Sequence, residues 1–324
     1  AVLCEERWPG RVRLGWTGGA EPEASVAVAG IPDTEIAAAV RDSAIAASGS
    51  DGWARATALH PESKRPYSPL APRFTKIDPA KYPDGWASYQ QSRWKILDNA
   101  LNHDRYGLLE LITGLGEAAH WQYRDASNFD SGASRWDMRP RMGGRDLVTD
   151  QVKKLGLSLM EWTPAEILDG LTGRRLKDTF SKDPSTSRAA SGFRPPGPTD
   201  NSIAWCALWG IALLPVEYRA SGISITPAAW PPSAFHPEAM FLAALSSPVT
   251  PSRYRTVLTS RALAEIGRNF GPTDGMGLDS PSADQAFRWL RQRGSLGVLR
   301  FPVVTRKAGL SRERLILEGT PCRP

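Results

Sequence analysis

The sequence of 324 residues has few of the residue types on which catalytic and metal sites are usually built. It holds four histidines and three cysteines, and neither set has the close spacing that zinc sites or paired thiols require. The odd number of scattered cysteines indicates no disulfide framework and favours a reducing compartment. Neither a glycine-rich phosphate-binding motif nor a nucleophile elbow is present. We therefore expect no catalytic residues, no metal ligands and no cofactor.

Long hydrophobic runs are also absent. The most apolar stretch, 203–216, is shorter than the roughly 18 residues that cross a bilayer, and it predicts a buried helix instead. No secretory signal is recognised at the start, although the chain does not begin with Met. We expect no membrane partner and a cytoplasmic location.

Positive charge is concentrated near the C-terminus. Residues 251–324 carry 13 Lys and Arg against 6 Asp and Glu, whereas residues 1–50 carry 4 against 7. All but one of the 13 cations are Arg, whose planar guanidinium suits bidentate contact with phosphate. A high-GC genome also replaces Lys with Arg, so this preference alone does not assign a nucleic-acid partner.

The order of expected elements predicts a mixed, mainly helical α+β protein, with an N-terminal β-hairpin region and a helical C-terminal part. Alternation predicts strands over 11–16 and 24–30, and a helix that begins at Asp33 or Thr34. Capping residues and apolar spacing predict further helices over 87–102, 106–116, 147–161, 163–173 and 201–216, with two more near the C-terminus. The last residues predict two strands around a turn at 307–309.

A polar stretch rich in Pro, Gly and Ser over 181–200 is the best candidate for a domain boundary. We expect an N-terminal α+β nucleic-acid-recognition domain over 1–185 and a mainly helical domain over 201–324. Within the helix over 201–216, Trp205, Leu208, Trp209 and Ala212 recur at helical spacing, which predicts a buried packing face.

An arginine-rich segment without regular periodicity spans 127–146. It is either an ordinary solvated loop or a contact for phosphates. Its tryptophan either stacks on a base or anchors the loop to the core, and its Ser and Asn suit base edges. The residues of this segment that we expect to contact DNA are Ser127, Asn128, Arg135, Trp136, Arg139, Arg141 and Arg145.

A second basic patch contains Arg288, Arg291 and Arg293. The first two are three residues apart and share one helix face. Such a run is often a solvated face, but two arginine-rich patches in a chain without catalytic motifs favour phosphate contact.

Four stretches, "VRLGWTGGAEPEASVAVAG", "TGLGEAAHW", "GASRWDM" and "PPGPTDNSIAWCALWGIALLPV", are similar to the large-subunit-like proteins of subtype I-U (also called I-G) CRISPR effector complexes. The resemblance implies a non-catalytic subunit of a Cascade ribonucleoprotein. Its expected partners are the guide RNA, target DNA, other Cascade subunits and the helicase-nuclease recruited on target binding. It implies recognition of the motif that flanks the target and assistance in forming the R-loop.

Two other classes of function stay open at this point. One is a metal-dependent nuclease that uses Asp125, Asp130 or Asp137. The other is a structural interaction protein that does not bind nucleic acid.

Overall fold

The computed structural model describes residues 1–17, 23–72, 77–116, 133–136, 147–179, 198–217, 225–234, 237–269, 281–308 and 311–322; for 305–308 and 311–315 only the backbone is described. The helices are α1 (Val2–Arg7), α2 (Asp33–Ser48), α3 (Pro83–Asn102), α4 (Tyr106–Leu115), α5 (Lys153–Met160), α6 (Pro164–Leu171), α7 (Asn201–Gly210), α8 (Pro251–Leu258), α9 (Arg261–Asn269) and α10 (Pro281–Arg291), with short helical turns η1 (Trp53–Arg55), η3 (Val148–Val152) and η5 (Ile211–Leu213). The strands are β1 (Val12–Trp16), β2 (Ala24–Val28), β3 (Ala58–Leu59), β4 (Pro66–Tyr67), β5 (Ala229–Trp230), β6 (Ala239–Leu245), β7 (Ser295–Ala308), β8 (Ser311–Ile316) and β9 (Thr320–Cys322). The chain is mixed α+β, as predicted.

The N-terminal hairpin and the capped helices form where the sequence predicts them. β1 pairs antiparallel with β2, so that Val12 lies opposite Val28. At the start of α6, the Thr163 side chain accepts a hydrogen bond from the Glu166 N–H at 3.2 Å. The Glu166 carboxylate in turn accepts from the Thr163 N–H at 2.9 Å, which completes a capping box. Two backbone donors that the first turn leaves without partners are thereby bonded.

The packing face predicted for α7 is confirmed. Trp205, Trp209 and Ala212 are buried, and Leu208 is half-buried at the edge of the face. The Trp205 indole N–H donates to the Ser43 hydroxyl of α2 at 2.8 Å, and its ring meets Trp209 edge-on. α7 therefore packs on helices from the first half of the chain.

The C-terminal part contains a sheet as well as helices. Its strands run in the order β5-β6-β7-β8, with β9 also paired to β7, and every pairing is antiparallel. β7 and β8 are the two strands expected around the turn at 307–309. β6 is not anticipated from the sequence, because its continuous apolar run lacks the alternation of a half-exposed strand.

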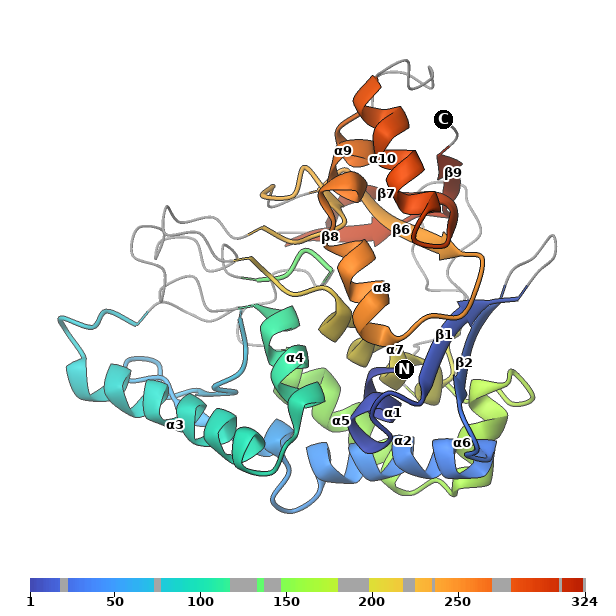
Figure 1. Ribbon diagram of the computed structural model, residues 1–324. Coiled ribbons are helices and arrows are strands. Elements are labelled where there is room, and N and C mark those ends of the chain that lie inside the picture. The colour runs from blue at the N-terminus through green and yellow to red at the C-terminus, as the bar shows by residue number, and fades with distance from the viewer. Residues whose placement is uncertain are drawn as a thin grey trace.

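One hydrophobic core connects the two halves of the chain. It contains Trp53 and Leu108 from the first half together with Phe241 and Leu290 from the second. Figure 1 shows α8, α9 and α10 beside the C-terminal sheet, while α1, α2, α5 and α6 lie on the other side of α7. The expected boundary near 185–201 is therefore not a break in the core. Within the described part of the chain, no helix has the length and apolar character needed to span a membrane.

Candidate nucleic-acid interface

Most of the segment 127–146 lies outside the described residues. This holds for Ser127, Asn128, Arg139, Arg141 and Arg145, whose DNA contacts stay predictions. The acids of the nuclease alternative, Asp125, Asp130 and Asp137, also lie outside them. Arg135 and Trp136 are described, and both have defined partners.

Arg135 lies in the interior and not on the surface. Its side chain is fully buried, its Nε donates to the Ala234 carbonyl at 2.6 Å, and its Nη1 donates to the Ala133 carbonyl at 2.7 Å. Trp136 is half-buried, and its indole N–H donates to the Pro227 carbonyl at 3.0 Å. The expectation that Arg135 faces a phosphate does not hold in this structure, because its side chain is buried and its Nε and Nη1 bind backbone carbonyls inside the protein. Sequence reasoning recognised the donors but had no information on the carbonyls.

The second basic patch is placed at the surface. α10 buries Ala283, Ala286, Phe287 and Leu290 and turns Arg288 and Arg291 to solvent. Arg293 follows the helix, and its guanidinium stacks over the Trp289 ring at 3.6 Å from the centroid. That stacking holds the group in place, together with a hydrogen bond from its Nη1 to the Trp289 carbonyl at 3.4 Å.

Two arginines that sequence reasoning did not single out join this patch. Arg13 of β1 and Arg253 of α8 line the same surface cleft as Arg291 and Arg293. The cleft has a volume of about 510 Å³. We call it the arginine cleft; its full lining is Arg13, Ser247, Pro248, Val249, Thr250, Arg253, Arg291, Gln292, Arg293 and Gly294. No described residue that lines it is acidic, and Arg288 lies outside it.

The loop between β6 and α8 brings these distant segments together. Val249 and Leu14 exchange two backbone hydrogen bonds of 2.8 Å, which fasten the loop to β1. On its other side, the backbone N–H and the hydroxyl of Ser246 both donate to the Gly294 carbonyl, at 2.7 and 3.0 Å. Gly294 has a φ of +87°, a conformation that favours glycine. The turn after α10 is thereby held against the loop, so that Arg291 and Arg293 line the same cleft as Arg13 and Arg253.

The N-terminus of α8 adds further positive potential. Thr250 caps this helix by accepting a hydrogen bond from the Arg253 N–H at 3.3 Å, and its side chain also lines the cleft. A helix N-terminus carries a partial positive charge, so acidic residues normally stabilise the first turn. α8 has no acid in its first turn and has Arg253 there instead. This arrangement is unfavourable without an anion and becomes favourable when one binds.

The cleft arginines differ from others nearby in having no ion pair with any described acid. On the same α8, Arg255 is paired with Glu110, and on α9 Arg268 is paired with Glu265 at 3.5 Å. Arg13 is oriented by its own strand, since its Nη1 donates to the Gly10 and Val12 carbonyls at 2.9 and 2.8 Å. These bonds fix the group but do not neutralise it. The cleft therefore presents four guanidinium charges, of which those of Arg13 and Arg293 are held by contacts within the protein.

One sequence signal does point to Arg253. "TPSR" places Thr250 at the cap and Pro251 at the first helical position, so Arg253 falls in the first turn, where a cation opposes the helix dipole. Arg13 has no comparable signal, because an exposed position on an alternating strand accepts any polar residue.

Within the described residues, no group of three or more His, Cys, Asp or Glu side chains is placed to hold a metal ion. Comparisons of the chain with protein-family models, with curated proteins and with solved structures found no match. The function is therefore inferred from the chemistry of the arginine cleft.

Proposed function

We propose that this chain is a non-catalytic subunit of an RNA-guided CRISPR interference (Cascade) complex, and that its arginine cleft binds backbone phosphates of target DNA near the flanking motif. The observation that carries the proposal is the convergence of Arg13, Arg253, Arg291 and Arg293 on one cleft without an acidic neighbour among the described lining. The resemblance of four stretches of the sequence to the large-subunit-like proteins supplies the biological context.

The chemistry of the cleft suits this task. In RNA-guided complexes, base pairing reads the sequence, so the protein needs phosphate contacts and a small reading element. Guanidinium groups bind phosphate oxygens with paired, charge-assisted hydrogen bonds. The N-terminus of α8 adds the partial positive charge of the helix dipole. Together these features hold a phosphate backbone in one register without selecting its sequence.

The other parts of the proposal also assign phosphate contact and base recognition to different residues. The segment 127–146 is the candidate for the reading element, with Ser127 and Asn128 facing base edges. The partners are the guide RNA, neighbouring Cascade subunits and a helicase-nuclease that arrives after R-loop formation, all in the cytoplasm. The chain contributes no cleavage of its own.

The decisive experiment measures binding of the assembled complex to matched target DNA over a salt series. Each phosphate contact removed lowers the slope of log affinity against log salt by about one, so Arg13→Ala, Arg253→Ala and Arg291→Ala combined should lower it by about three. Arg174→Ala is the matched control, because Arg174 is exposed and lies outside the cleft. An unchanged slope in the triple variant, with normal complex assembly, would refute the role of the cleft.

Catalysis is tested separately on the purified chain. We expect no cleavage of DNA with Mg²⁺ or Mn²⁺ present, since the proposed subunit only binds. Metal-dependent cleavage that disappears in Asp130→Ala would replace this proposal with the nuclease alternative.

A further inference from the structure

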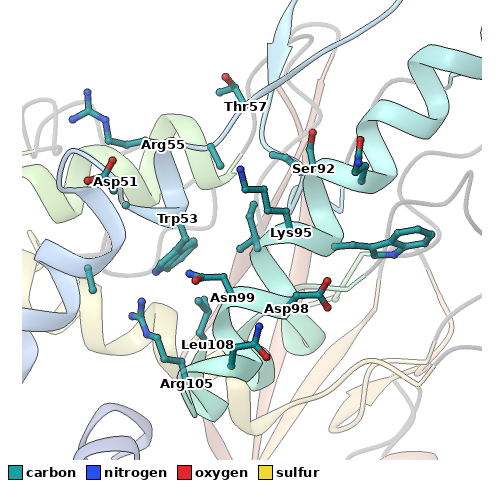
Figure 2. A pocket seen from close by; sticks show the side chains of 18 of the residues that line it. Asp51, Trp53, Arg55, Thr57, Ser92, Lys95, Asp98, Asn99, Arg105 and Leu108 are labelled. Carbon is teal, nitrogen blue, oxygen red and sulfur yellow. The ribbon is translucent and has the colours of Figure 1, made fainter.

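A concavity of about 1220 Å³ lies between α2 with η1 on one side and one face of α3 on the other (Figure 2). Its charged lining residues are three basic (Arg55, Lys95, Arg105) and two acidic (Asp51, Asp98), so nothing in it selects one class of ligand. The outer edge of the N-terminal hairpin is different, because its backbone specifies how a partner would bind.

β2 is an exposed edge strand. Residues 24–27 are all exposed, with Val26 at 41%, and only Val28 is buried. Among the described strands β2 pairs with β1 alone, while the loop around Val249 covers the other side of β1, next to α8 (Figure 1). Natural edge strands usually carry a Pro, a Lys or another charge that prevents pairing with a second chain. The five residues of β2, Ala-Ser-Val-Ala-Val, include none of these.

The backbone of β2 presents hydrogen-bonding groups away from the hairpin. Leu14 lies opposite Val26, and the N–H and C=O of Leu14 both bond Val249, on the side of β1 away from β2. Pairs that exchange hydrogen bonds alternate with pairs that do not in an antiparallel ladder, and the Leu14–Val26 pair is of the second kind. The N–H and C=O of Val26 therefore face outward from the hairpin, as do the N–H groups of Ala24 and Val28.

A second copy of β2 fits this edge in one register. Antiparallel pairing of β2 with itself about Val26 overlaps the whole strand and sets Ala24 opposite Val28 of the second copy. Outward groups then meet outward groups at every second residue. A shift of one residue would set outward groups against inward ones, so it is excluded. The contact is isologous, as in two-fold symmetric dimers.

Charge complementarity supports the same register. It sets Glu23 opposite Ala29 of the second copy, and the Arg11 guanidinium donates to the Ala29 carbonyl within each chain. Glu23 and Arg11 are both exposed, and neither forms an ion pair with a residue that the structure describes. In the paired sheet they lie two strands apart on one face, with about 10 Å between their Cα atoms, which the two side chains together can span. The two-fold symmetry makes this contact twice.

We propose that β2 is a self-association surface, at which two copies of this chain form a four-stranded antiparallel sheet in the order β1-β2-β2-β1. The loop around Val249 covers the outer edge of each β1, so no further strand adds and assembly stops at the dimer. An interface of one short strand from each copy is small, which makes the association weak and dependent on concentration. β2 contributes no residue to the arginine cleft, so this inference does not depend on the proposed function.

The test is sedimentation velocity of the full chain over a range of protein concentration, where a monomer–dimer equilibrium is expected. Val26→Pro should weaken dimerisation about 10-fold or more, because it removes an outward N–H from each copy. It leaves the bonds to β1 in place, since proline is tolerated on an edge strand where its missing N–H faces solvent. Val26→Thr is the control, because it keeps the N–H and the β-branched shape and should dimerise like the parent chain. A thermal midpoint for each variant checks that the hairpin is intact.

Charge reversal provides a second, independent test. Glu23→Arg alone and Arg11→Glu alone should each weaken dimerisation about 2- to 5-fold, and the combined variant should restore it, because exposed ion pairs contribute modestly. A chain that stays monomeric at every concentration overturns the inference, as does a dimer that Val26→Pro leaves unchanged. Failure of the combined variant to restore dimerisation refutes the register. The salt slope of DNA binding should be the same in Val26→Pro and the parent chain, which separates this test from that of the arginine cleft.

Discussion

Arg135 and Arg291 carry the same side chain and are used in opposite ways. Arg135 is fully buried and donates to backbone carbonyls, whereas Arg291 is exposed at a cleft whose described lining contains no acid. The Arg135 guanidinium donates hydrogen bonds that hold the segments 133–136 and 225–234 together. The Arg291 guanidinium makes no ion pair with a described acid, and we propose that it binds a DNA phosphate. The number of arginines in a stretch of sequence does not distinguish these two cases. The hydrogen-bond acceptors around each side chain do distinguish them.

The largest expected effect tests the structural side of this comparison. Arg135→Ala should lower the free energy of unfolding by about 2–5 kcal/mol, because it leaves a cavity and removes the donors of the Ala133 and Ala234 carbonyls. Urea unfolding followed by circular dichroism measures this, with Arg174→Ala as the exposed control. A loss below about 0.5 kcal/mol, the range of surface substitutions, would show that Arg135 is accessible in solution and return it to the candidates for DNA contact.

The second prediction concerns the turn that presents Arg291 and Arg293. Gly294→Ala should cost about 1–2 kcal/mol of stability, because a φ of +87° is strained for a residue with a Cβ. It should also weaken DNA binding, since the turn orients both arginines. Gly297→Ala is the matched control, as its Cβ would meet open space and its φ is not positive. Equal stability of the two variants would mean that the turn has no fixed conformation.

Much of this fold could be predicted from the sequence, and the exceptions have physical reasons. The hairpin at Val12, the capping box at Thr163 and the buried Trp205 depend on local patterns, so they were found. β6 was missed because burial on both faces removes its alternation. The arginine cleft could be anticipated only in part: Arg291 and Arg293 share one short stretch, but Arg13 and Arg253 join them only through tertiary contacts of the loop around Val249.

The third prediction separates stability from function within the cleft. Arg253→Ala should leave the stability of the free protein unchanged or raise it by a few tenths of a kcal/mol, because it removes a cation from the positive end of α8. The same variant should lower the salt slope of DNA binding by about one. Thermal unfolding and a salt titration on one preparation measure both. A clear loss of stability would mean that Arg253 is a structural residue like Arg135.

The smallest expected effect distinguishes the two exposed arginines of α10, Arg288 and Arg291. Arg288 and Arg291 lie three residues apart on α10, both are exposed, and only Arg291 lines the arginine cleft. Both Ala variants should keep the stability of the free protein within about 0.5 kcal/mol, because neither side chain is buried. Arg291→Ala should lower the salt slope by about one, whereas Arg288→Ala should lower it by less than half as much.

Equal reductions would mean that DNA follows the whole outer face of α10, as the sequence pattern alone suggested. A reduction in Arg288→Ala only would place the DNA on the side of α10 away from the cleft. In both cases the convergence of Arg13 and Arg253 on Arg291 would lose its connection to DNA binding.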